Sequence, residues 1–134
     1  MVDKNVNNKI ITISVKTDAR LTKNGLKKTH YRMIATLTKQ HRDNAYLLAS
    51  VEKANSKLKT PFKKAVIKIK SYWCGVRMDY DGLACSVAPA IDGMVDAEII
   101  LDDNPSIVQG YYMEYERVKS RKDVRVDVSI EGVQ

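Results

Sequence analysis

The chain has 134 residues and a formal net charge of +7. This length fits one domain that spans residues 1–134. No apolar stretch approaches the roughly 20 residues that cross a bilayer, and the first residues lack the apolar core of a secretion signal. We therefore expect a cytoplasmic protein without membrane contact. Cys74 and Cys85 form neither a disulfide framework nor a zinc-binding spacing, which fits the same reducing compartment.

Charge is distributed unevenly along the chain. Residues 1–77 carry 18 basic and 4 acidic side chains, whereas residues 78–134 carry 5 basic and 12 acidic ones. Basic surfaces attract nucleic-acid phosphates whatever the base sequence. An ordinary solvated face is the alternative, but the clustering of the basic residues favours DNA or RNA as the partner. The two clusters are Lys23, Lys27, Lys28 and Arg32, and Lys57, Lys59, Lys63, Lys64, Lys68 and Lys70.

The first half of the chain predicts a strand, a loop, a helix and a second strand. Alternating apolar residues predict a strand over Lys9–Val15, and the polar, basic segment Asp18–His30 is expected to be a long loop. Apolar residues at spacings of three and four predict a helix over Thr38–Ala54. His41 lies on the apolar side of this helix, where a packed histidine is a better interpretation than a ligand. Lys64–Trp73 alternates again and predicts a strand with one buried and one basic face.

The second half predicts a helix followed by two more strands. The i+4 spacing of apolar residues indicates a helix over Leu83–Val95, in which Pro89 is expected to cause a kink or a break. Ile99–Leu101 is a short extended piece. Ile107–Arg117 and Val124–Ile130 are predicted to pair as a hairpin. The expected fold is therefore α+β, a mixed β-sheet packed against two helices in the order β-α-β-α-β-β.

Seven acidic residues lie between Met78 and Asp103 with no Lys or Arg among them. Like charges that are brought together repel one another, and a divalent metal ion held by oxygen ligands would offset them. Asp79 and Asp81, two apart at the end of the second predicted strand, would share one face, and the chain can return Asp103 to them. Alternatively, Asp81 caps the following helix and Asp102-Asp103 marks a turn.

Three segments of this region resemble one known family. Asp79-Tyr-Asp81-Gly-Leu83, Ile91-Asp92-Gly93-Met94-Val95-Asp96-Ala97 and Leu101-Asp102-Asp103 are similar to the RusA family of Holliday-junction resolvases. That family shows Asp-x-Asp-Asn-Leu, then a helix with Asp-Gly-Leu or Asp-Ala-Leu. An Asp-Asp pair ends eleven residues after the helix Asp, and Asp92 and Asp103 keep this spacing. Arg42-Asp43-Asn44-Ala45 and the basic segment 24–32 are similar too.

The resemblance implies a RusA-like fold and Mg²⁺-dependent cleavage of four-way or other branched DNA by paired nicks, with Mn²⁺ able to replace Mg²⁺. It implies a homodimer, because a four-way junction presents two-fold symmetry, and such proteins are frequent in phages and prophages. The family's metal-binding, catalytic carboxylates fall on Asp79, Asp81 and Asp103. The basic loop, with Lys23, Lys27, Lys28 and Arg32, is expected to grip DNA phosphates.

Two positions depart from the family pattern. Gly82 replaces the usual Asn, and neither Ala88 nor Cys85 supplies the basic side chain that the family carries on this helix. A second hypothesis therefore stays open, in which the chain binds junctions or duplex DNA without cleaving them. A third is a small interaction protein whose acidic segment is simply solvated.

Overall fold

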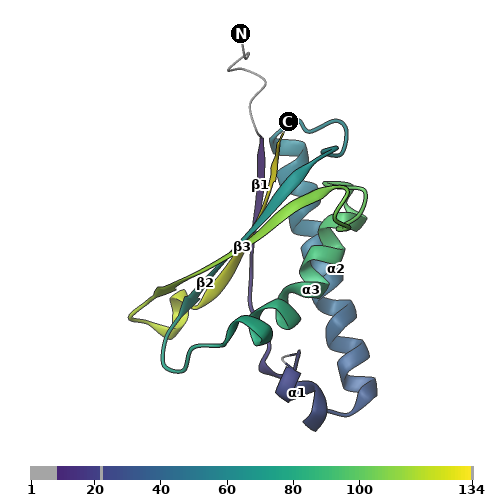
Figure 1. Ribbon diagram of the computed structural model, residues 1–134. Helices are drawn as coiled ribbons and strands as arrows, with labels where there is room; N and C mark the ends of the chain where they lie inside the picture. Colours follow the sequence, from purple (N-terminus) through teal and green to yellow (C-terminus); the bar gives the residue numbers. More distant parts are fainter. Residues whose placement is uncertain (1–8, 22, 134) are drawn as a thin grey trace.

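The structure is a computed structural model that describes residues 9–21 and 23–133 (Figure 1). Four strands, three α-helices and two short 3-10 turns follow one another in this part of the chain. In chain order they are β1 (Ile10–Val15), η1 (Ala19–Leu21), α1 (Lys23–Lys28), α2 (Tyr31–Asn55), β2 (Ala65–Trp73), α3 (Tyr80–Asp96), β3 (Val108–Arg117), η2 (Arg121–Asp123) and β4 (Arg125–Gly132). The α+β class that the sequence predicts is confirmed.

The strands form one mixed sheet in the order β1-β4-β2-β3. β4 pairs antiparallel with both β1 and β2, whereas β3 runs parallel to β2 and is joined to it through α3. The predicted hairpin of Ile107–Arg117 with Val124–Ile130 is therefore wrong, because β2 lies between these strands. The connector from β3 to β4 begins beside the end of β2, where the backbone NH of Val118 donates to the carbonyl oxygen of Trp73 at 2.8 Å.

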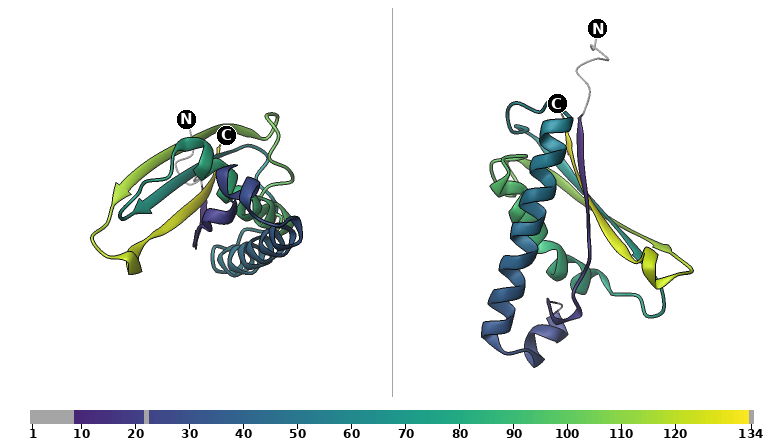
Figure 2. Two further views of the ribbon diagram at one scale, coloured as in Figure 1. Left: turned by 90° about the horizontal axis from the view of Figure 1, so that it is seen from below. Right: turned by 180° about the vertical axis from the view of Figure 1, so that it is seen from behind.

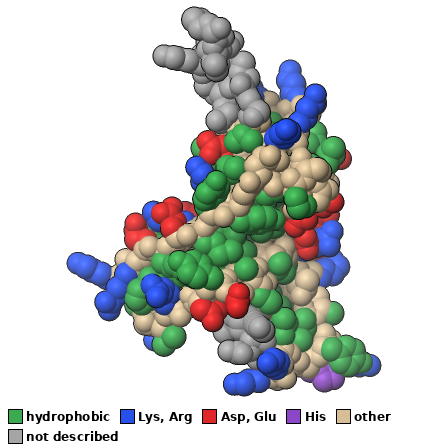
Figure 3. Space-filling model, in the orientation of Figure 1, with side chains coloured by type: hydrophobic (Ala, Val, Ile, Leu, Met, Phe, Trp, Pro, Cys, Tyr) green, Lys and Arg blue, Asp and Glu red, His purple; other side chains and the backbone are tan. Residues whose placement is uncertain are grey.

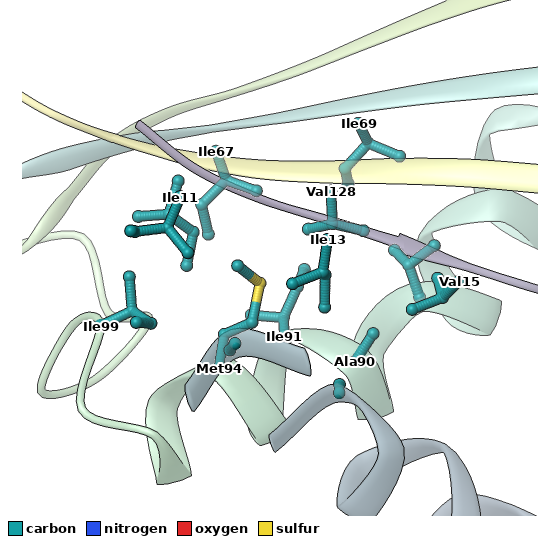
Figure 4. Packing of buried hydrophobic residues seen from close by; sticks show 14 of the residues in the cluster. Ile11, Ile13, Val15, Ile67, Ile69, Ala90, Ile91, Met94, Ile99 and Val128 are labelled. Carbon is teal, nitrogen blue, oxygen red and sulfur yellow. The ribbon is translucent and has the colours of Figure 1, made fainter. Parts of the chain in front are cut away.

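The two longer helices cover one face of the sheet (Figure 2). Alternating residues of the strands point towards them, such as Ile11 and Ile13 of β1 and Ile67 of β2, and these side chains are buried. Met94 and Ile91 of α3 pack against this layer (Figure 4). The alternation of apolar residues thus predicts the buried face correctly, because successive strand residues point to opposite sides.

The helices differ from the prediction in number and length. Asp18–His30 is not one loop, because η1 and α1 lie within it. α2 begins at Tyr31 rather than Thr38, and the side chain of His30 caps it by accepting a hydrogen bond from the backbone NH of Arg32 at 3.2 Å. Most side chains in these first turns of α2 are exposed, whereas Leu37 is buried.

α3 is one continuous helix with Pro89 inside it, so the predicted alternative of a break is wrong. In Figure 1 the first turns of α3 lie at an angle to the later turns, in keeping with the predicted kink. Pro89 itself is buried. No helix in the described parts of the chain is both long and apolar enough to cross a membrane.

α2 and α3 approach each other closely at Gly93. A Cβ atom at this position would collide with the carbonyl oxygen of Arg42 and would lie 2.8 Å from the Cβ of Ala45. Glycine is therefore required by the packing of the two helices. The guanidinium of Arg42 forms two hydrogen bonds to the carboxylate of Asp96, at 2.6 and 2.8 Å. This ion pair joins α2 to α3 beside the close approach at Gly93.

Candidate functional site

Asp79 and Asp81 lie at the beginning of α3. The prediction that they end the second strand is wrong, because β2 ends at Trp73. Asp79 is the N-cap residue, and its Oδ1 accepts a hydrogen bond from the backbone NH of Gly82 at 2.7 Å. Asp81 is exposed in the first turn. The positive end of the helix dipole favours carboxylates here, so the helix itself offsets part of their charge.

A second acidic group lies towards the other end of α3 and consists of Asp92, Asp102 and Asp103. Burial raises the pKa of Asp92, and the carboxylates of Asp103, Asp96 and Asp102 raise it further against the opposing effect of Arg42. Burial, followed by the charges of the same group, also raises the pKa of the nearby Tyr111 hydroxyl. Asp102 accepts hydrogen bonds from the backbone NH of Asp103 and from the side chain of Asn104. The turn itself follows over residues 105–107, closed by the backbone NH of Ile107 donating to the carbonyl oxygen of Asn104, so the alternative interpretation placed it too early at Asp102-Asp103.

The two acidic groups are separated within one chain. From Tyr80 to Asp92 the helix rises about 18 Å, at roughly 1.5 Å per residue. Two tyrosines of β3 show the same separation. In addition to burial, the charge of Asp79 raises the pKa of Tyr115, whereas the charge of Asp103 raises the pKa of Tyr111, four residues earlier in the strand. Residues 9–21 and 23–133 contain no group of three His, Cys, Asp or Glu side chains placed to hold one metal ion. The structure thus brings Asp103 to Asp92 and not to Asp79 and Asp81.

Two of the seven acidic side chains have cations from α2 as partners. Asp96 pairs with Arg42, and Glu98 lies 3.9 Å from the Nζ of Lys53. The sequence could not show these pairs, since the partners are more than forty residues apart. Within the described side chains the other five carboxylates form no ion pair. They are Asp79, Asp81, Asp92, Asp102 and Asp103.

We expect Asp92→Asn to raise the melting temperature at about pH 7 and to leave it nearly unchanged at about pH 3. Because folding raises the pKa of Asp92, its contribution to stability is complete only while it is protonated and is lost as the pH rises through the folded pKa. Thermal unfolding at both pH values measures the difference.

Asp96→Asn is the matched control, one helical turn further along α3. Arg42 lowers the pKa of Asp96, so this carboxyl stabilises the fold above its unfolded pKa and loses that effect in acid. Asp96→Asn should therefore lower the melting temperature at about pH 7. The same sign for both variants at this pH would contradict the electrostatics described for α3.

The predicted phosphate-binding residues lie on α1 and at the start of α2. Lys27, Lys28 and Arg32 are exposed, and the guanidinium of Arg32 lies over the Tyr31 ring at 5.8 Å. Lys23 begins α1, but its side chain lies outside the described residues. Both α1 and η1 contact α3, and Figures 1 and 2 place α1 near the beginning of that helix. A basic surface therefore lies beside Asp79 and Asp81.

On the basic face predicted for the second strand, with Lys64, Lys68 and Lys70, two of the three lysines have acidic partners. Lys68 pairs with Glu131 at 2.9 Å, and Lys70 pairs with Glu116 at 3.3 Å, across the face of the sheet that the helices do not cover. The charge of this face could not be read from β2 alone, because the acidic partners come from the neighbouring strands β4 and β3.

Sequence reasoning missed a basic end of the sheet. All five basic residues of the acidic C-terminal half lie within residues 117–125, around the connector between β3 and β4. Arg77 joins them from the connector between β2 and α3, and Figure 3 shows blue side chains gathered around this outer end. The clustering is visible in the sequence, but the net charge of the whole half conceals it.

The chain matches no protein-family model and no curated protein. The fold and the site define an α+β protein with two acidic groups along one helix and basic surfaces on either side of the first group. The likeness to the RusA family rests on the motif residues around Asp79, Asp92 and Asp103.

Proposed function

We propose that the protein is a Mg²⁺-dependent endonuclease that nicks branched DNA, with four-way junctions as the substrate that the resemblance implies. The observation that carries this proposal is the position of Asp79 and Asp81 between two basic surfaces. Lys27, Lys28 and Arg32 lie on one side, and the arginines at the outer end of the sheet lie on the other. A DNA strand whose phosphates are bound by both surfaces would lie next to the carboxylates of Asp79 and Asp81.

The donor chemistry fits Mg²⁺, because the five carboxylates without an ion-pair partner among the described side chains supply only oxygen ligands. A bound Mg²⁺ would polarise the scissile phosphate and lower the pKa of an attacking water. The placement of the carboxylates within one chain does not fit, since α3 separates Asp79 and Asp81 from Asp103. We therefore propose a site shared between two chains, in which Asp79 and Asp81 of one subunit face Asp103 of the partner subunit.

Arg77 is the best-placed replacement for the missing helix lysine. It is exposed two residues before Asp79, and its guanidinium lies 5.1 Å from the centre of the Tyr115 ring, which itself packs edge-on against Tyr80. The aromatic contacts hold the cation beside the carboxylate pair without neutralising it. Arg77 can therefore bind a phosphate that lies next to Asp79.

The second candidate function is junction binding without cleavage. It is favoured by Asp79, whose carboxylate already serves as the cap of α3, and by Ala88, which is exposed on α3 and carries no charge. Both features allow the acidic residues to stabilise the helix while the basic surfaces bind DNA.

A synthetic four-way junction labelled on one strand tests the proposal. We expect paired nicks near the crossover with Mg²⁺ or Mn²⁺ and none with EDTA. Asp79→Asn, Asp81→Asn and Asp103→Asn should each lower cleavage by at least about a hundredfold while junction binding survives. Asp43→Asn is the control, because this carboxylate pairs with Lys39 on the exposed side of α2 and should leave cleavage unchanged.

Tight junction binding with no nicks in either metal would make the binding protein the better assignment. Ala88→Lys then separates two explanations. Restored cleavage would show that the missing lysine alone disables the site, whereas no cleavage would favour the protein that binds DNA without cutting it.

A further inference from the structure

The outer end of the sheet combines exposed cations with aromatic rings. Arg77, Arg117, Lys119, Arg121 and Lys122 are all exposed, and none forms an ion pair with a described side chain. The nearby acidic side chain of the connector is Asp123. In Figures 1 and 2 this end extends away from α2 and α3, so the cations face solvent on a part of the sheet that these helices do not cover.

The arginines are arranged around half-buried rings. The guanidinium of Arg77 lies 5.8 Å from the centre of Trp73 and 5.1 Å from that of Tyr115. Arg117 approaches Trp73 at 5.6 Å. Tyr80 stands edge-on to Tyr115 and is 62% exposed, so most of its ring is available for another contact. Cations and flat apolar surfaces therefore alternate over one continuous surface.

An open hollow of about 500 Å³ continues this surface. It is lined by Cys74, Arg117, Val118 and Lys119. Two of these four residues are cations, and Arg117 belongs both to the hollow and to the ring cluster. The hollow therefore provides space next to two positive charges, and Arg117 connects it to the ring of Trp73.

We propose that this outer end binds unpaired nucleotides, with a base stacked on Tyr80 and the phosphates held by Arg77, Arg117 and the connector. Aromatic platforms within a positive groove are the usual means of binding single strands, because every base has a flat face. A paired base inside a duplex cannot stack on a tyrosine, whereas bases at a branch point can separate. This inference rests on the proposed function and identifies the part of a branched substrate that lies against Asp79 and Asp81.

Trp73 makes the proposal directly measurable, since it is the only tryptophan of the chain. An oligothymidylate of about 12 nucleotides should change the fluorescence of Trp73, and a duplex of equal length should change it much less. Tyr80→Ala should weaken binding of the oligothymidylate about tenfold and leave duplex binding nearly unchanged. Arg117→Ala should weaken single-strand binding and lower the slope of log affinity against log salt by about 0.7.

Tyr112→Ala is the matched control. Tyr112 is 58% exposed, close to the 62% of Tyr80, but it lies on the opposite face of β3 from Tyr115. Its removal should not affect either affinity. Arg32→Ala provides the other comparison, because a phosphate contact on α2 should weaken single-strand and duplex binding alike.

Several outcomes would overturn the proposal in distinguishable ways. Binding of the junction and duplex with no response of Trp73 to oligothymidylate, and no loss in Tyr80→Ala, would overturn this inference and leave the proposed function intact. No binding of any DNA by the unmodified protein would overturn the proposed function as well. An equal response of Trp73 to polyglutamate would identify the outer end as a surface for acidic chains in general.

Discussion

Gly93→Ala is expected to lower the melting temperature by about 8 °C. The added methyl group would meet backbone atoms of α2, the carbonyl oxygen of Arg42 and the backbone nitrogen of Tyr46, and neither can turn aside as a side chain can. Overpacking against backbone atoms costs about 3 kcal/mol of stability. This cost exceeds the roughly 1 kcal/mol by which alanine is more favourable than glycine within a helix. For a domain of this size each kcal/mol corresponds to about 4 °C.

Gly82→Ala is the control for this prediction, being the same change in the same helix. Its methyl group would meet side-chain and not backbone atoms, of Met78 and Asp79 at 2.8 and 2.9 Å, so we expect a smaller loss, which includes the cap hydrogen bond from Gly82 to Asp79. Calorimetry of both variants compares the two effects. If Gly93→Ala melts within about 2 °C of the unmodified protein, α2 and α3 do not approach as closely as described.

Mixing two inactive variants is expected to restore cleavage. If Asp79 and Asp81 of one chain act with Asp103 of its partner, a heterodimer of Asp81→Asn and Asp103→Asn contains one intact site and one doubly damaged site. Each homodimer has no intact site. About half of a random mixture is heterodimer with one working site, so nicking should rise from below about 1% to roughly a quarter of the original rate.

The products of the mixed sample provide a second measurement. One working site should nick a single strand of each junction, so nicked junctions should accumulate over resolved ones. A control mixture of Asp79→Asn with Asp81→Asn should stay inactive, because both changes fall on the same side of the shared site. No recovery in the first mixture, with subunit exchange verified by mass, would contradict a site shared between chains.

The buried face of the sheet could be predicted from the sequence because it depends on local alternation. Ile11, Ile13 and Ile67 occupy the expected side, and the exposed residues between them face away. Strand order could not be predicted in this way. Neighbouring strands in sequence pair often, and nothing in the β3–β4 connector shows that it passes around the end of β2.

The candidate site shows the same limit. Spacing along the chain brought Asp92 and Asp103 into one motif, and the structure places them together. Spacing could not show that α3 separates Asp79 from that group, because the chain after the helix was long enough to return. The pairing of Asp96 with Arg42 and the ring contacts of Arg77 depend on tertiary packing and left no local signal.

The order of the strands also determines when the sheet can form. β4 follows the other described strands in the sequence, yet it lies between β1 and β2, and the backbone NH of Gly132 donates to the carbonyl oxygen of Lys9. On the ribosome, β1 and β2 must wait with unpaired edges until β4 has emerged. Exposed edges of this kind favour association between chains. Emergence of residues 125–132 is therefore the step that closes the sheet and removes the unpaired edges of β1 and β2.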